Sequence, residues 1–286
     1  MFVNAGIPNR NSALARVCRS VRKTRSGFVA LLALIFQYLA GNETGQTANA
    51  MFDPAPQLHR SIPEISKCRQ LVVVTTMAWD VANATIQRFE RRQSGQTSWQ
   101  RVGEPLPGVI GKGGFAWGIG LHGTGKAGEP NKREGDQRSP AGVFRLSCVF
   151  GLASSSQVRF LRFPYRHITA TMEAIDDPYS RYYNRIVDRA AIAHPDWSSS
   201  ESMLRVGGPY RWGIMIEHNW RPVPDCGSCI FLHVWDSARR GTAGCTAVNS
   251  AQLEQLLHWL NVQKNPLIVQ LPLPEYVLLR QSWKLP

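Results

Sequence analysis

A cysteine and a histidine near the C-terminal end of the chain have the side chains of a thiol nucleophile and its base. His233 lies in the apolar run Cys-Ile-Phe-Leu-His-Val-Trp of residues 229–235, and Cys245 lies in a segment of small residues. The polar loop 236–241 between them is long enough to fold back and bring the two together. An imidazole beside a thiol favours the thiolate, which is the attacking species in cysteine catalysis. The pair predicts nucleophilic catalysis; the alternative is a core histidine with a small buried cysteine.

The same region also permits a metal site or a disulfide. Cysteines 226, 229 and 245 and His233 are ligand types that zinc accepts, and the spacing from 229 to 233 suits one face of a strand. No second histidine–cysteine pair closes such a set, so we expect no metal ion and no cofactor. Two disulfides stay open as alternatives, Cys226–Cys229 and Cys68–Cys148.

Segments typical of strands dominate the chain before and between these residues. Residues 71–77 are a continuous β-branched run, which predicts a strand buried on both faces, and residues 83–91 alternate apolar and polar, which predicts a half-exposed strand. A turn at 94–99 predicts a hairpin into a third strand through Val102. Further strands are expected at 143–150, 212–219 and 266–271, and the glycine-rich loop 109–120 is expected at a strand crossing and not around a phosphate.

Two other segments have recognisable patterns. Residues 172–188 are irregular and rich in tyrosine and arginine, which favours a surface loop beside a polar cleft. Residues 250–260 carry leucines on one helical face, which predicts an amphipathic helix with Ser250 as its N-cap. The chain has no repeat and no low-complexity tract, so we expect one domain at 71–286, preceded by an irregular segment at 51–70.

Residues 1–50 have the composition of a signal peptide or export leader. A basic stretch ends at Arg25, the apolar run 28–36 follows, and Ala48-Asn-Ala50 matches a small-x-small cleavage site. The apolar run is too short to span a bilayer comfortably, and an uncleaved anchor is the alternative. In both cases the folded part is expected in the periplasm or cell envelope, with membrane contact only through the leader.

The charge of the chain restricts its partners. The 286 residues carry a net charge of +13, of which residues 1–50 contribute +5 and the remainder +8. A basic protein suits an anionic partner, such as a polyanionic wall or a carboxylate-bearing peptide. The sequence shows no helix with a basic stripe and no aromatic–glycine recognition motif, so a nucleic acid is not expected.

Five motifs follow one another along the chain. They are Lys-Arg-Glu-Gly-Asp with Ser-Pro-Ala-Gly-x-Phe in 132–144, Asp-Pro with Tyr-Asn-Arg in 177–185, Ile-Glu-His-Asn at 216–219, Gly-Ser-Cys-Ile-Phe-Leu-His at 227–233, and Gly-Cys-Thr at 244–246. Together they resemble the catalytic domain of the L,D-transpeptidase (YkuD-type) family, in a branch with a Gly-Thr-Ala-Gly-Cys-Thr nucleophile turn, here residues 241–246. The resemblance covers roughly residues 70–272.

The resemblance implies a fold and a mechanism. The fold is mainly β (β-rich α+β), a β-sandwich or barrel with a short helix after the nucleophile turn. Cys245 would attack a carbonyl of a peptidoglycan stem peptide with His233 as general base, and the acyl group would pass to an amine of a second stem peptide or to water. Gly244 and Thr246 flank the nucleophile, where backbone N–H groups can line an oxyanion site.

The nucleophile turn differs from the commonest form in the family, and polar residues elsewhere are candidates to bind the substrate. In the commonest form a histidine stands at the position of Ala243, and an arginine or asparagine stands at that of Ala247. This difference leaves the acceptor open between an amine and water. The expected function is therefore an exported L,D-transpeptidase-like acyltransferase, with an L,D-carboxypeptidase or other amide hydrolase and a non-catalytic wall-binding module as alternatives. The substrate-binding candidates are His218, Glu217, Asn219, Arg133 and Arg185.

Overall fold

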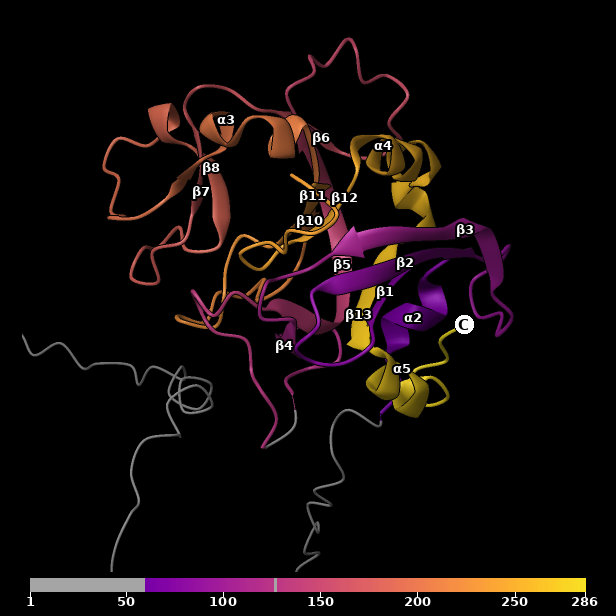
Figure 1. Ribbon diagram of the computed structural model, residues 1–286. Coiled ribbons are helices and arrows are strands. Elements are labelled where there is room, and N and C mark those ends of the chain that lie inside the picture. The colour runs from indigo at the N-terminus through magenta and orange to yellow at the C-terminus, as the bar shows by residue number, and fades with distance from the viewer. Residues whose placement is uncertain (1–59, 126–127) are drawn as a thin grey trace, which may run out of the picture. The chain divides into compact units, whose positions relative to one another are not determined.

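Eight strands close into a barrel, which is the centre of the fold (Figure 1). The computed structural model describes residues 60–125 and 128–286, so the predicted leader and residues 51–59 lie outside the described residues. The ring runs β5–β10–β11–β12–β3–β2–β1–β13 and returns to β5. The barrel strands are β1 (Gln70–Thr76), β2 (Asn83–Glu90), β3 (Gln100–Val109), β5 (Ser139–Gly151), β10 (Trp212–Ile216), β11 (Phe231–Val234), β12 (Thr246–Val248) and β13 (Leu267–Pro272).

The pattern of buried residues explains why these segments form the barrel. In β1 every side chain is buried except that of Thr75, which is half-buried, as expected for a β-branched run covered on both faces. The C-terminal helix α5 (Leu273–Leu279) packs against β1 and β13 and so covers part of β1. The alternating burial at the start of β2 matches its alternating sequence. The first three predicted strands are therefore confirmed, with the third extended to Val109.

Two short strands and a small second sheet lie beside the ring. β4 (Phe115–Trp117) and β6 (Tyr165–His167) both pair with β5 in parallel. The second sheet has the order β8–β7–β9, from β7 (Met172–Ile175), β8 (Arg185–Asp188) and β9 (Glu201–Ser202). Residues 172–188 are thus not an irregular loop throughout, because two strands of four residues each begin and end the segment. Strands this short leave too few residues for a periodic pattern to be visible.

The helices are short and lie outside the ring. α4 (Ser250–Trp259) follows β12 directly and packs its leucines 253, 256 and 257 against β10 and β11. Its N-cap is Asn249 and not Ser250: the Asn249 side chain accepts the Gln252 N–H, and the Gln252 side chain accepts the Asn249 N–H in return. The other helices are α2 (Pro63–Lys67), α3 (Met203–Val206) and the 3₁₀ turns η3 (Arg189–Ala191), η4 (Gly208–Arg211) and η5 (Val262–Lys264).

The architecture confirms the fold class expected from the sequence. It is mainly β, with a closed barrel and a short helix after the nucleophile turn. The segment leading into the barrel is not wholly irregular, since α2 lies within it and buries Ile65 in the core. None of the helices in the described residues is long and apolar enough to cross a membrane.

Candidate active site

Cys245 lies immediately before β12, and its side chain returns to the start of β11. The two strands are parallel, with Leu232 opposite Thr246. The Phe231 N–H donates to the Cys245 Sγ at 3.3 Å, and the thiol donates to the Cys229 carbonyl at 3.6 Å. Cys245 is half-buried, so the sulfur is held by backbone groups and still faces a cavity.

Two hydroxyl groups hold the nucleophile turn in place. The Ser139 Oγ lies 2.7 Å from the Gly244 carbonyl and 3.0 Å from the Cys245 carbonyl, and it accepts the Gly111 N–H at 2.9 Å. The Thr242 Oγ1 donates to the Cys245 carbonyl at 2.5 Å and accepts the Gly244 N–H at 3.1 Å. Because the Gly244 amide is occupied in this way, it is not free to line an oxyanion site.

The amide of Cys245 itself differs from that of Gly244. Within residues 60–125 and 128–286, no hydrogen bond uses the Cys245 N–H. A backbone N–H that has no other acceptor can donate to an oxyanion. In the described residues the Cys245 amide is thus available as a hydrogen-bond donor.

His233 lies on β11 and reaches a cavity that Cys245 also lines. Its Nδ1 lies 2.8 Å from the Val234 carbonyl, which can only accept, so Nδ1 carries the proton and Nε2 is the basic nitrogen of the neutral ring. The ring packs edge-on against Tyr210, with centroids 5.5 Å apart. This cavity, of about 280 Å³ and lined by His233, Tyr210 and Cys245 among others, is called the histidine cavity below.

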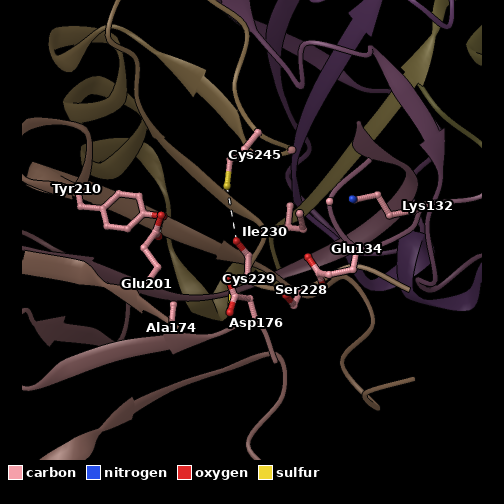
Figure 2. Close-up of a pocket in the computed structure, with 13 residues that line it drawn as sticks. Lys132, Glu134, Ala174, Asp176, Glu201, Tyr210, Ser228, Cys229, Ile230 and Cys245 are labelled. Atoms are coloured by element: carbon pink, nitrogen blue, oxygen red, sulfur yellow. Dashed lines mark hydrogen bonds between the residues drawn. The ribbon is translucent and has the colours of Figure 1, made fainter. Parts of the chain in front are cut away.

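A second cavity of about 250 Å³ also reaches Cys245 (Figure 2), and it shares Glu201, Tyr210 and Ala243 with the histidine cavity. Tyr210 and Glu201 lie on one side of it and Lys132 and Glu134 on the other, with the cysteine between them. Because most of its charged groups are carboxylates, it is called the acidic cavity below. Its polar lining residues include Lys132, Glu134, Asp176, Glu201, Ser228 and Cys229.

The environment keeps both members of the pair neutral. Burial raises the pKa of Cys245 to about 12; Glu201 also raises it, while the Phe231 N–H and Lys132 act in the opposite direction. Burial lowers the pKa of His233, although the hydrogen bond to the Val234 carbonyl and the charge of Asp236 act to raise it. The resting site therefore holds a thiol and a neutral imidazole, and not a thiolate–imidazolium pair.

Four of the residues predicted from sequence do not line either cavity. His218 is 2% exposed, with its Nε2–H donated to the Cys226 carbonyl at 2.8 Å and its Nδ1 accepting the Ile119 N–H at 3.2 Å. Burial lowers the pKa of His218 to about 3, so the ring is neutral. Asn219 is fully buried and donates to the carbonyls of Val223 and Gly227. Glu217 and Arg133 line neither cavity.

The two remaining candidates also have other neighbours. Thr246 is fully buried, and its hydroxyl bonds the Gln270 side chain of β13. Arg185 is exposed and lines a separate cavity of about 190 Å³ with Cys148. Of the predicted catalytic, oxyanion and substrate-binding residues, the structure thus brings Cys245, His233 and Gly244 to the two cavities.

Several residues of the site region were not predicted as site residues. Ser139, Lys132, Glu134 and Asn184 belong to the motifs, so the motifs themselves were the signal. Asn184 connects three of them, because its side chain donates to the carbonyls at 218 and 219 and accepts the Cys229 N–H. Tyr210, Glu201 and Asp176 lie outside the quoted motifs, and no local pattern marks them.

The thiols of the described residues do not form the bridges considered from sequence. Cys68, Cys148, Cys229 and Cys245 are all free, which excludes both the Cys68–Cys148 and the Cys226–Cys229 disulfide. Where the structure describes the chain, no group of three or more histidine, cysteine, aspartate or glutamate residues is arranged to hold a metal ion.

The closed β-barrel presents a thiol immediately before β12 and an imidazole on the adjacent strand β11. The family model of the L,D-transpeptidase catalytic domain, YkuD, matches residues 122–269, which is more than half of the chain. The chain therefore belongs to the YkuD family. Searches of curated proteins and of solved structures gave no match. Membership supports an L,D-transpeptidase-type activity on peptidoglycan peptides.

Proposed function

We propose that this protein is an exported cysteine acyltransferase that cross-links or remodels peptidoglycan stem peptides through a thioester at Cys245. The observation that carries the proposal is that Cys245, immediately before β12, and His233, within the adjacent strand β11, line one cavity. Family membership supplies the substrate class. The basic charge of the chain is consistent with an anionic wall.

The first half of the reaction forms the thioester. Because the thiol and imidazole rest neutral, the Cys245 proton passes to the Nε2 of His233 as Sγ attacks the carbonyl carbon. The carbonyl becomes an oxyanion, and the free Cys245 N–H is the proposed donor to it. Collapse breaks the C–N bond, and the departing amine takes the proton from His233.

The second half of the reaction transfers the acyl group. An amine of a second stem peptide enters the histidine cavity, loses a proton to the Nε2 of His233 and attacks the thioester. The C–S bond then breaks, and the expelled thiolate of Cys245 takes the proton from His233. Water in the place of the amine would give the hydrolase alternative.

A labelling experiment tests the proposed nucleophile. Cys245→Ala should abolish covalent labelling by a carbapenem-type acylating probe, followed by mass spectrometry of the intact protein. Cys148→Ala is the matched control, because that thiol is free and lies away from both cavities, and its labelling should equal that of the wild type. Undiminished labelling of Cys245→Ala would reject the mechanism.

Incubation with purified stem tetrapeptides tests the reaction. Cross-linked dimers would support acyl transfer to an amine, and trimmed tripeptides would support the hydrolase. Binding of the peptides with neither product would support a non-catalytic wall-binding module instead.

Export is proposed from the sequence of residues 1–50, with the periplasm or cell envelope as the location. Mass spectrometry of the protein recovered from the envelope should give an N-terminus near residue 51. Recovery of the chain with residues 28–40 intact would instead support the uncleaved anchor.

A further inference from the structure

The sulfur of Cys245 has two backbone contacts, and they are held in different ways. The Phe231 N–H donates to Sγ, and the thiol donates to the Cys229 carbonyl at 3.6 Å, a hydrogen bond drawn in Figure 2. Barrel pairing holds the first contact, because the Ile230 carbonyl, in the same peptide group as the Phe231 N–H, accepts the Ile216 N–H at 3.0 Å. Cys229 precedes β11, and the strand pairings of the described residues do not include it. The second contact therefore depends on groups outside the barrel ladder.

Cys229 has a backbone conformation that is costly for a cysteine. Its φ is 52°, in the left-handed region that favours glycine. A Cβ atom comes too close to the following carbonyl oxygen in this region, so a residue other than glycine stays there only when other contacts stabilise it. Those contacts also determine where the Cys229 carbonyl points.

Two contacts to Cys229 come from the base of the hairpin that β7 and β8 form. The Asn184 Oδ1 accepts the Cys229 N–H at 2.8 Å, and the Cys229 thiol donates to the Ile175 carbonyl at 3.4 Å. Ile175 is the last residue of β7, Asn184 directly precedes β8, and the Asn184 N–H donates to the Ile175 carbonyl at 2.9 Å. The second sheet thus holds the residue whose carbonyl contacts the nucleophile.

The side chain of Asn184 is itself fixed by the segment that follows β10. Its Nδ2 donates to the carbonyl of His218 at 2.9 Å and to that of Asn219 at 2.8 Å. A carbonyl only accepts and a backbone N–H only donates, so a single orientation of the amide satisfies all three hydrogen bonds. Asn184 also has a positive φ, 61°, which asparagine tolerates better than most residues. Its amide is therefore a well-held link between the end of β10 and Cys229.

We infer that Asn184 is a positioning residue for the nucleophile, which acts through the backbone of Cys229. It holds the Cys229 carbonyl where this oxygen orients the thiol of Cys245. Asn184 lines neither cavity, so it is not placed to bind the substrate directly. The inference rests on the proposed function and deepens it, since it names a residue that aligns the attacking sulfur.

Loss of the Asn184 side chain should affect two reactions of Cys245 differently. Acylation requires the sulfur to face both His233 and the attacked carbonyl carbon, and a misplacement of about 1 Å can cost about 100-fold in rate. Alkylation by iodoacetamide needs no such alignment, because a small reagent can approach the sulfur from several directions. A positioning role therefore predicts slower acylation with little change in alkylation.

The test compares these two reactions in Asn184→Gly, made in the full chain. Glycine keeps the positive φ and removes the amide. Single-turnover acylation of Cys245 by a carbapenem-type probe should be about 10- to 100-fold slower than in the wild type. Modification by iodoacetamide, followed at Cys245 by peptide mass spectrometry, should keep a rate close to that of the wild type.

Asn265→Gly is the matched control. Asn265 is also an asparagine with a positive φ, 48°, at an exposed position outside both cavities. The exchange to glycine therefore has the same effect on the unfolded chain, and it should change neither reaction.

A second variant shows whether Asn184 acts through Cys229. In Cys229→Gly the left-handed conformation is no longer costly, so it needs less support from Asn184. Addition of Asn184→Gly to this variant should slow acylation less than the same change does in the wild type. Equal losses in the two backgrounds would contradict an action through Cys229.

The remaining outcomes separate this inference from the proposed function. An acylated wild type with an unchanged acylation rate in Asn184→Gly would overturn the positioning role alone. Faster alkylation of Cys245 in Asn184→Gly would show that the thiol has become exposed, and the role would then be structural; urea unfolding gives the folded fraction of each variant. A wild type that the probe does not acylate would reject the proposed function, and this inference with it.

Discussion

The protonation of His233 and Cys245 at rest determines how the site responds to pH. A preformed thiolate–imidazolium pair requires a low thiol pKa and a high imidazole pKa. Burial has the opposite effect on both groups here. In the proposed mechanism the imidazole is therefore a general base that acts during attack, and its neutral form must be present for acylation to begin.

The first prediction concerns the acid limb of acylation. Because burial lowers the pKa of His233, the neutral base persists below the ordinary value of about 6.5. A profile of acylation rate against pH should therefore fall only below about pH 6.5. His233→Gln should lower the rate by about 10²- to 10⁴-fold and remove this limb. A limb centred above pH 7 in the wild type would contradict the assignment of His233 as a neutral base.

At the scale of elements, the nucleophile turn depends on strands that are distant in sequence. Ser139 begins β5, and its hydroxyl bonds carbonyls about a hundred residues later in the chain. The same hydroxyl accepts the Gly111 N–H, which lies before β4. One buried side chain thus joins three loops that meet at the nucleophile.

The second prediction is that Ser139→Ala weakens both the fold and the reaction. Loss of the hydroxyl leaves the Gly111 N–H and the Gly244 carbonyl without this partner, while the Cys245 carbonyl keeps Thr242, and it should cost about 1–3 kcal/mol of unfolding free energy. A displaced Cys245 should reduce the acylation rate by up to about 100-fold. Urea unfolding and single-turnover acylation measure the two effects. Ser237→Ala, in the exposed loop before the turn, should change neither, and equal effects of the two variants would contradict this role for Ser139.

At the scale of the whole molecule, two buried histidines link the fold to pH. His122 packs among Trp117, Phe144 and Trp283, and burial lowers its pKa to about 4. His218 lies next to Phe144, and burial lowers its pKa to about 3. Both are neutral in the folded protein, and their ordinary pKa in an unfolded chain is about 6.5.

The third prediction is that the free energy of unfolding decreases as the pH falls below about 6.5. In that range the unfolded chain binds protons at these histidines and the folded chain does not, until the pH approaches the lowered values. Each histidine should contribute a slope of up to about 1.4 kcal/mol per pH unit. Urea unfolding between pH 7 and 5 measures the slope. His194→Gln, at an exposed position, should leave it unchanged, and a flat stability over this range would contradict the prediction.

Local patterns were sufficient to predict much of the barrel. The β-branched run at β1 and the alternation at β2 indicate strands, because in a strand the burial of each residue depends on the face of the sheet to which its side chain points. The helix α4 was also predictable, although its cap is one residue earlier than expected. The strands β7 and β8 were missed, since four residues are too few to show a period and pairing partners decide their conformation.

The sequence by itself determined the chemistry of this protein: one cysteine and one histidine, each next to an apolar strand, with motifs in a recognisable order. The tertiary structure decided which other residues surround the pair. It buried His218, Asn219 and Thr246 in the scaffold, and it brought Glu134, Asp176, Glu201 and Ser228 together from four separate segments. The physical reason is that barrel closure and strand register place residues far apart in sequence side by side, and no local periodicity encodes these contacts.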